Sequence, residues 1–324
     1  MPESIKSIAK TILAQEPCAV VRHRLLRDVL KRPTDEAKAA LDRSTMVQML
    51  AEEQCEDGSW GRFHSMDTTR KQKIKTTEAG VRRAIALGLD KDHPICANAC
   101  DYLVRILKGQ QAFPDRPEPN DRWPVGERLF LTATLSLLEP EHPLVQANRA
   151  VWIEILKRTF HDGCYDQDAE VEAHCELTGA TTMRGFYLTI NNRYALELLS
   201  SGTNEVPAEL ERTYLNWLTT YPDGINYIGR CRINQPPTEH PSSINCWFQS
   251  WEVLSHFPHW VEFAQPSIDW LWSQQNDNGL WDFGSRPARY GSLPLSDSWR
   301  KKNNRIFDWS TRVLLLLSQY ERDS

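Results

Sequence analysis

Two kinds of helical segment alternate along this chain, and their alternation limits the fold more than any other feature of the sequence. Four segments carry apolar residues on one face only, at residues 93–109, 142–160, 206–221 and 259–275. Segments that are apolar on most faces follow them, at residues 127–138, 185–199, 242–257 and 306–320. A helix that is apolar on most sides is buried, whereas an amphipathic helix lies at the surface. The sequence therefore predicts that outer and inner helices alternate.

The N-terminal part of the chain continues this pattern. Residues 19–31 and 76–89 read as inner helices, and residues 7–15 and 44–53 read as outer helices. No linker-like segment divides the chain. The expected fold class is all-α: a single (α/α)6 toroid, or barrel, of about twelve helices in one domain that spans residues 1–324.

A short motif recurs at the ends of the outer segments. The pattern Gln-x3-Gly-x-Trp occurs at residues 54–60 and again at residues 275–281. Weaker versions, which keep an Asp at the turn, occur at residues 113–116, 161–165 and 221–227. The five turns are 47 to 61 residues apart. A repeat of this length accommodates a pair of helices.

Composition excludes several classes of protein. The net charge is −5 and no dense Lys/Arg tract occurs, which disfavours a nucleic-acid partner. The chain has neither a signal-peptide pattern at its N-terminus nor an apolar run long enough to span a membrane. Its eight cysteines are scattered, without a CxxC pair, and are expected to be reduced. The expectation is a cytoplasmic protein; the sequence does not identify a cofactor or an oligomeric state.

The Gln-x3-Gly-x-Trp motif, repeated with pairs of helices, resembles the QW repeat of terpenoid cyclases. The wider superfamily, which includes squalene/hopene cyclases and protein prenyltransferase β subunits, is built on an α/α toroid. In that family the Gln caps a helix end and the Trp stacks beside it. The resemblance implies a structural role for Trp60 and Trp281, and it implies an enzyme that acts on an isoprenoid.

Long loops are expected on one face of the toroid. Connections from outer to inner helices are long and span residues 61–76, 112–125, 160–184, 222–242 and 276–304, whereas the return connections are short. Function concentrates on loops that a rigid scaffold carries. The same face presents the N-termini of the inner helices, which favour anions. We therefore expect a small-molecule site at this mouth.

The expected binding site combines loop residues with the start of the segment at 76–89. Glu78 and Arg82 lie one turn apart, although Glu78 also fits a purely structural charge at a helix start. Guanidinium groups suit phosphate or carboxylate, and aromatic faces stabilise cations. We expect a polar or anionic headgroup to bind above an aromatic floor. The other expected members of this site are Arg122, Trp123, His174, Tyr227, Arg300 and Asp308, with Trp247, Trp251 and Trp309 as the floor.

Family motifs suggest catalytic candidates, and each departs from the family pattern. The DxDD acid of class II cyclases is matched by Asp166 and Asp168, but Ala169 stands at the final position. A general acid needs a raised pKa, which neighbouring acids could supply, and the expected catalytic set is Asp166, Asp168, His174 and Asp308. The DDxxD metal motif of class I enzymes is absent from the sequence.

A zinc site is the low-ranked alternative for this chain, and no metal is expected. Asp162 and Cys164 match the Asp-x-Cys of prenyltransferase β subunits, but Thr311 stands where the family has its His. His174 or His240 could take its place, since zinc accepts any convergent set of such ligands.

Three classes of function stay open on the sequence alone. The first is an isoprenoid-handling enzyme, of terpene cyclase or prenyltransferase type. The second is a carbohydrate-active lyase or hydrolase on an α/α toroid, and the third is a non-catalytic binding protein with this fold. Fold does not determine function. The cavity discriminates between them: a dry aromatic pocket favours an isoprenoid, a wet groove favours a sugar, and a filled ring favours no catalysis.

Overall fold

The computed structural model describes residues 4–66, 69, 71–118, 122–180, 188–237, 241–285 and 293–324. Within these ranges the regular structure is helical, with fourteen α-helices, one π-helical turn and no β-strand. The expectation of an all-α chain is confirmed. None of the described helices is long and apolar enough to cross a membrane.

The twelve helices expected from the sequence are all present. The segments expected at the surface form α1 (Ile5–Leu13), α4 (Thr45–Glu52), α6 (Pro94–Leu107), α8 (Pro143–Thr159), α11 (Ala208–Thr220) and α13 (Val261–Ser273). The segments expected to be buried form α2 (Ala19–Arg24) with η1 (Leu25–Val29), α5 (Thr77–Leu87), α7 (Trp123–Ser136), α10 (Arg193–Ser200), α12 (Pro241–Leu254) and α14 (Lys302–Asp323).

Two further helices were not expected. Helix α3 (Asp35–Asp42) follows η1, and α9 (Gln167–Thr178) occupies most of what the sequence suggested was a long acidic loop. Asp166 caps α9 by accepting hydrogen bonds from the backbone N–H groups of Asp168 and Ala169. The acidic residues of the first turn favour the positive end of the helix dipole, and α9 packs along α8.

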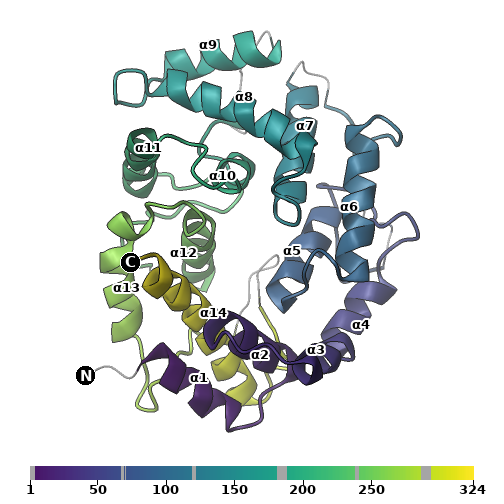
Figure 1. The fold of residues 1–324 in the computed structure, drawn as a ribbon, viewed down its shortest axis with the longest axis vertical. Helices are drawn as coiled ribbons and strands as arrows, with labels where there is room; N and C mark the ends of the chain where they lie inside the picture. Colours follow the sequence, from purple (N-terminus) through teal and green to yellow (C-terminus); the bar gives the residue numbers. More distant parts are fainter. Residues whose placement is uncertain are drawn as a thin grey trace.

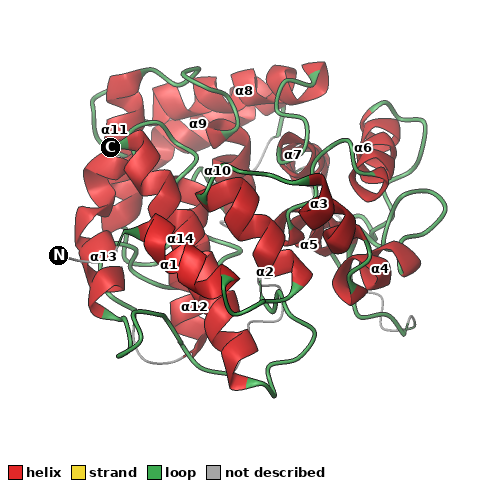
Figure 2. Cartoon of the chain, turned by 60° about the horizontal axis from the view of Figure 1, so that its bottom comes forward, coloured by secondary structure: helices red, strands yellow, loops and turns green. Residues whose placement is uncertain are grey.

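Consecutive helices pack against one another around the molecule. Contacts join α4 to α5, α5 to α6, α6 to α7 and α7 to both α8 and α10, and α10 in turn contacts α12. Helix α14, the last of the chain, packs against α1, α2 and η1. The first and last helices of the chain are therefore neighbours (Figures 1 and 2).

Both copies of the Gln-x3-Gly-x-Trp motif make the same contacts. The side-chain amides of Gln54 and Gln275 donate to the carbonyls of Gly58 and Gly279, at 2.9 and 2.8 Å. The indole N–H of each Trp donates to a carbonyl of the preceding outer helix: Trp60 to Leu50, and Trp281 to Leu271. The backbone N–H of each Trp donates to a hydroxyl in the next inner helix, Thr77 or Ser310. Each motif thus ties an outer helix to the inner helix that follows.

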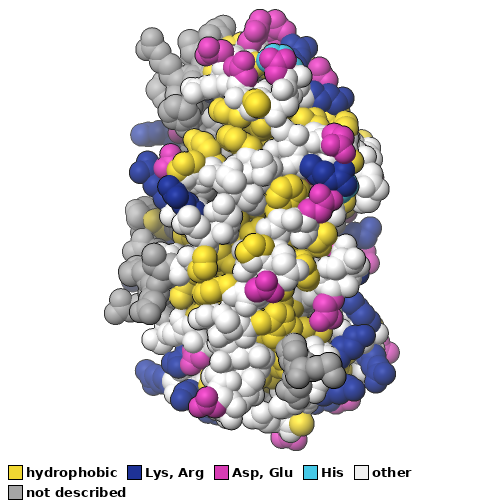
Figure 3. Space-filling view, turned by 90° about the vertical axis from the view of Figure 1, so that its left-hand side faces the viewer, with side chains coloured by type: hydrophobic (Ala, Val, Ile, Leu, Met, Phe, Trp, Pro, Cys, Tyr) yellow, Lys and Arg dark blue, Asp and Glu magenta, His cyan; other side chains and the backbone are white. Residues whose placement is uncertain are grey.

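Hydrophobic side chains also reach the outer side of the molecule. On the face drawn in Figure 3 they lie in bands between charged residues. Trp217 of α11 and Trp270 of α13 are half-buried. Trp217 stacks on Tyr165 with ring centroids 4.4 Å apart, and Trp270 lies edge-on to Trp247 of α12 at 4.9 Å. These aromatic contacts tie the outer helices to their neighbours.

Buried carboxylates hold two of the long loops. Asp115 accepts hydrogen bonds from the backbone N–H groups of Phe63, His64 and Ser65, at 2.6 to 3.0 Å. Asp308 accepts from the backbone of Leu295 and Ser296 in the same way. Buried backbone N–H groups need such partners, so each carboxylate fixes the path of a loop next to the inner helices.

Candidate functional site

A cavity of about 350 Å³ lies between the inner helices. Its lining includes Arg24 of α2, Arg82 of α5, Glu197 of α10, Glu252 of α12 and Arg312 of α14, and Leu137 at the end of α7. All six inner elements therefore contribute to its wall. A volume in this range suits a small molecule.

The cavity is lined by basic and aliphatic side chains. Seven basic residues face two carboxylates, Glu197 and Glu252, among the described lining residues. The basic residues are Arg24, Lys73, Lys75, Arg82, Arg83, Arg193 and Arg312. The aliphatic residues are Ile74, Ala79, Ile85, Ala86, Leu137, Val253, Leu293, Leu295, Leu315 and Leu316. The chain as a whole carries a net charge of −5, so this lining is more basic than the chain as a whole, although Lys73 is exposed and Lys75 is half-buried.

One carboxylate serves two arginines. Glu197 pairs with both Arg82 and Arg193, the second at 2.8 Å, and its side chain is only 3% exposed. Arg193 also donates to Gln249 Oε1 at 3.1 Å. Arg82 Nη2 and Glu197 Oε2 are buried without a hydrogen-bond partner in the described part of the chain. This wall therefore contains one hydrogen-bond donor group and one acceptor atom that make no hydrogen bond within the described residues.

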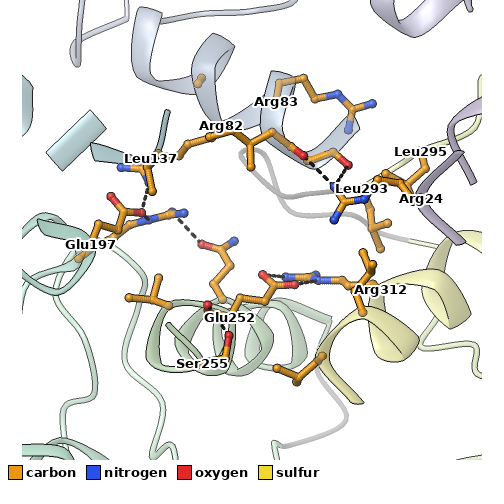
Figure 4. Close-up of a pocket in the computed structure, with 18 of the residues that line it drawn as sticks. Arg24, Arg82, Arg83, Leu137, Glu197, Glu252, Ser255, Leu293, Leu295 and Arg312 are labelled. Atoms are coloured by element: carbon orange, nitrogen blue, oxygen red, sulfur yellow. Dashed lines mark hydrogen bonds and ion pairs between the residues drawn. The ribbon is translucent and has the colours of Figure 1, made fainter. Parts of the chain in front are cut away.

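The opposite wall holds a second ion pair (Figure 4). Arg312 makes a two-pronged contact with Glu252, at 2.6 and 2.8 Å, and its guanidinium lies 4.8 Å from the ring centre of Phe248. Arg24 donates to the carbonyls of Ile85 and Ala86 at 2.7 and 2.8 Å. Paired guanidinium forks and aromatic faces hold a buried arginine in one orientation.

Neighbouring charges set the protonation of this wall. Burial lowers the pKa of Arg82, but the Glu197 carboxylate outweighs burial and raises that pKa above its ordinary value. Burial lowers the pKa of Arg83 to about 10, and the charge of Asp308 offsets only part of this effect. Both guanidiniums are charged near neutral pH, so an anion that enters the cavity meets fixed positive charge.

A second polar cluster borders this cavity, where loop 61–66 meets α5 and α10. His64 Nδ1 lies 3.1 Å from Glu78 Oε1 and 2.9 Å from the hydroxyl of Tyr194. The Tyr194 hydroxyl donates to Glu78 Oε2. The ring of Tyr194 also lies 5.5 Å from the guanidinium carbon of Arg82, which connects the cluster to the cavity wall. We call His64, Glu78 and Tyr194 the mouth cluster.

Only part of the expected binding site is brought together. Arg82 lines the cavity, and Glu78 lies one turn away in the mouth cluster. Tyr227 is 41% exposed and packs edge-on against His64 at 5.5 Å. Trp123 is half-buried at the start of α7, edge-on to Phe113. Arg122, the residue before Trp123, and the exposed Arg300 do not line the cavity.

The expected aromatic floor is instead core packing. Trp247, Trp251 and Trp309 are at most 2% exposed, and the cavity lining does not include them. Trp247 contacts Trp270 of the outer helix α13, and Trp251 contacts Trp260. Trp309 instead contacts Phe248 and Phe283, and the guanidinium carbon of Arg312 lies 5.7 Å from its ring centre. The large apolar surfaces of these indoles fill the core between helices.

The expected catalytic residues have structural contacts. Asp166 caps α9, Asp168 is exposed, and both lie outside the cavity lining. His174 is fully buried beside Trp152, at a ring distance of 5.0 Å. Asp308 lies below loop 293–299 and accepts hydrogen bonds from Leu295, Ser296 and Trp299. Burial raises the pKa of Asp308 despite these hydrogen bonds.

The zinc alternative gains no support from the described residues. Asp162 and Cys164 are both exposed at the turn before α9, and Asp162 contacts His161 at 3.0 Å. No group of three or more His, Cys, Asp or Glu residues is placed to hold a metal ion in the described ranges. His240 lies outside those ranges.

Most of the basic cavity residues were missed at the sequence level. A usable signal was present: Arg24, Arg82, Arg83, Arg193 and Arg312 all stand inside segments that read as buried helices. Arginine is rarely buried unless it is paired. Several such residues in inner helices of one ring indicate a shared polar interior.

The chain was also compared with known proteins. No protein-family model, no curated protein and no solved structure matched it. The site is therefore interpreted from its own geometry.

Proposed function

We propose that this protein is an α/α toroid that binds a small amphipathic anion, of the prenyl-diphosphate type, in its central cavity. Two observations support the toroid: the helices include all twelve that the sequence predicted as outer or inner, and side chains of α2, α5, α10, α12 and α14, with Leu137 just after α7, line one cavity. Packing of α14 against α1 and α2 is consistent with a closed ring.

The excess of basic side chains in the cavity carries this proposal. Burying a charge is costly unless it is paired. The lining holds seven basic residues and two carboxylates; Arg24 pairs with Asp28 outside the lining, and Lys73 is exposed. Arg82 and Arg193 share the single carboxylate of Glu197. An anionic ligand would add negative charge beside Arg82 and Arg193, and guanidinium forks are well suited to phosphate oxygens.

The aliphatic part of the lining indicates a ligand with an apolar portion. Ile74, Val253 and Leu316 are among the ten aliphatic residues that face the same space as the arginines. The described lining contains no Trp, Tyr or Phe, the side chains that stabilise a carbocation by cation–π contact. The lining therefore supports binding or transfer of a prenyl-type anion better than its cyclisation.

An acidic carbohydrate is the second candidate, and the mouth cluster is the observation that favours it. His64, Glu78 and Tyr194 form a half-buried hydrogen-bonded group beside the exposed ring of Tyr227. Polar groups and an exposed aromatic ring suit a sugar acid. A carbohydrate-active enzyme and a non-catalytic binding protein would both use the same basic cavity.

Titration calorimetry near neutral pH tests the proposal. The ligands are inorganic diphosphate, geranyl diphosphate, geraniol and digalacturonate. We expect geranyl diphosphate to bind roughly tenfold or more tightly than inorganic diphosphate, and geraniol to bind weakly, because both parts of the ligand contribute. Preferred binding of digalacturonate would favour the carbohydrate alternative, and no binding of any anion would refute the site.

Two arginine variants locate the binding. Arg82→Met should leave Glu197 paired with Arg193, and Arg83→Met keeps most of the side-chain volume. Each should weaken diphosphate binding by roughly tenfold or more, the effect of losing a charge-assisted hydrogen bond. Arg212→Met on the outer face of α11 is the matched control, since Arg212 pairs with Glu209 and Glu262 away from the cavity. Equal losses of diphosphate affinity in all three variants would show that the diphosphate does not bind in the cavity.

A further inference from the structure

The two ring nitrogens of His64 differ in their contacts. Nδ1 contacts Glu78 at 3.1 Å and Tyr194 at 2.9 Å. Nε2 makes no hydrogen bond within the described part of the chain, on a side chain that is 34% exposed. A carboxylate that binds Nδ1 orients the imidazole and leaves Nε2 to exchange a proton with a ligand.

The position of His64 is fixed from several sides. Asp115 holds the backbone of the loop through the N–H groups of residues 63–65. The imidazole stacks on Phe130 at 5.4 Å, and Tyr227 lies edge-on to it at 5.5 Å. Tyr227 has a left-handed backbone, with φ of 66°, which is uncommon for a non-glycine residue. Such strain is found preferentially at functional sites.

The mouth cluster is continuous with the cavity. Glu78 and Arg82 lie one turn apart on α5, and the Arg82 guanidinium lies over the ring of Tyr194. Arg82 in turn pairs with Glu197, which lines the cavity together with Arg193. His64, Glu78 and Tyr194 are not themselves part of the described lining, and Arg82 is the lining residue that contacts the cluster.

We propose that the mouth cluster is a proton-donor subsite, in which His64 Nε2–H donates to an oxygen of an anionic ligand that the cavity arginines hold. This subsite rests on the proposed anion-binding function. When the proton is transferred, the Nε2–H bond breaks and the proton joins the ligand oxygen. The neutral imidazole regains a proton from water, while Glu78 stays ionised and keeps Nδ1 as the donor to its carboxylate.

The surrounding charges favour a protonated His64. Burial lowers the pKa of His64, but the hydrogen bond and charge of Glu78, together with the charge of Asp115, outweigh burial and raise the pKa above its ordinary value. Arg82 acts in the opposite direction. Burial and the charge of Glu78 keep the pKa of Tyr194 well above its ordinary value, so this phenol stays neutral.

The test uses hexanesulfonate, an amphipathic anion that does not titrate in the range studied. Its affinity for the full chain is measured by calorimetry from about pH 6 to about pH 9. We expect affinity to fall by up to roughly tenfold per pH unit above the His64 pKa, because the neutral imidazole cannot donate from Nε2. His64→Gln should bind more weakly at low pH and show little pH dependence.

Variants show whether His64 or another titratable group causes the pH dependence of affinity. Glu78→Gln should lower the His64 pKa and move the loss of affinity to lower pH, with the pKa read from histidine NMR signals. His161→Gln, at an exposed turn, should bind as wild type does. His256 lines the cavity, but burial lowers its pKa, so His256→Gln should leave the profile above neutral pH unchanged.

Two outcomes would contradict the subsite, and they are distinguishable. If His64→Gln keeps the wild-type affinity and pH profile while Arg82→Met loses affinity, the cavity binds the anion and His64 takes no part. If the wild-type protein binds no hexanesulfonate at any pH, the anion-binding cavity is refuted and the subsite with it.

Discussion

Trp281 links three segments of the chain through one side chain. Its indole N–H reaches Leu271 of α13, its backbone N–H reaches Ser310 of α14, and its ring is completely buried. Trp60 repeats these contacts between α4 and α5. Large buried aromatics of this kind dominate the free energy of packing.

Replacing Trp281 should be costly. We expect Trp281→Ala to lower the free energy of unfolding by roughly 3–5 kcal/mol, because a large cavity and an unpaired carbonyl are left behind. Val171→Ala, on the exposed side of α9, should change it by less than about 0.5 kcal/mol. Urea unfolding of both variants checks this, and similar stability of the two would contradict a structural role for the motif.

His64 should make stability depend on pH with a definite sign. Because the His64 pKa is raised in the folded protein, its contribution is complete below the unfolded value of about 6.5. The contribution is lost as pH rises through the folded pKa. The difference in unfolding free energy between wild type and His64→Gln should therefore shrink as the pH rises above about 6.5. Urea unfolding at several pH values measures it, and a constant or growing difference would contradict the raised pKa.

Helix α5 carries a glycine whose replacement tests how its face packs. A Cβ built at Gly80 would lie 2.3 Å from the indole of Trp60, although Gly80 is in the helix interior. Replacing an interior helical glycine by alanine ordinarily stabilises by up to about 1 kcal/mol. Gly80→Ala should instead destabilise, since the indole is buried and cannot move aside.

Gly126 of α7 supplies the matched control for Gly80. A Cβ there would meet the side chain of Leu188 at 3.4 Å, an ordinary contact. Gly126→Ala should therefore be neutral or stabilising, by up to about 1 kcal/mol. Thermal unfolding compares the two, and stabilisation by Gly80→Ala would show that Trp60 does not pack as described.

At the level of elements, the sequence pattern predicted the helices better than the connections. Helical periodicity and the Gln-x3-Gly-x-Trp motif depend on local contacts, so all twelve expected helices are present. The hydroxyl of Thr76 accepts a hydrogen bond from the backbone N–H of Ala79 at the start of α5. Helix α9 was missed because its acidic, weakly amphipathic sequence reads as a solvated loop and becomes helical against α8.

The site was harder to predict because it depends on contacts across the whole molecule. Helix periodicity alone predicted that Glu78 and Arg82 lie one turn apart on one helix, and both lie on α5. The partners of Arg82 could not be predicted, since Glu197 lies 115 residues away in the chain. The hydrogen bonds that Asp308 accepts from the backbone of Leu295 and Ser296 could not be predicted either, since the sequence does not show which backbone groups a carboxylate satisfies.

For the whole molecule, our proposal of one central binding position rests on a basic cavity that several helices line together. Arg82, Arg193 and Arg312 belong to three different helices, so only the assembled fold brings them together. We propose that these three arginines together bind one anionic ligand. Binding measurements give the affinity, but only the position of the bound ligand shows whether these arginines contact it.

The most direct test is a crystal structure of the full chain with geranyl diphosphate bound. We expect the diphosphate to lie between the inner helices, in hydrogen-bond contact with Arg82 and at least one other cavity arginine. The prenyl chain should contact the aliphatic wall near Val253 and Leu316. A diphosphate bound on the outer surface, or inner helices that enclose no common cavity, would contradict the account.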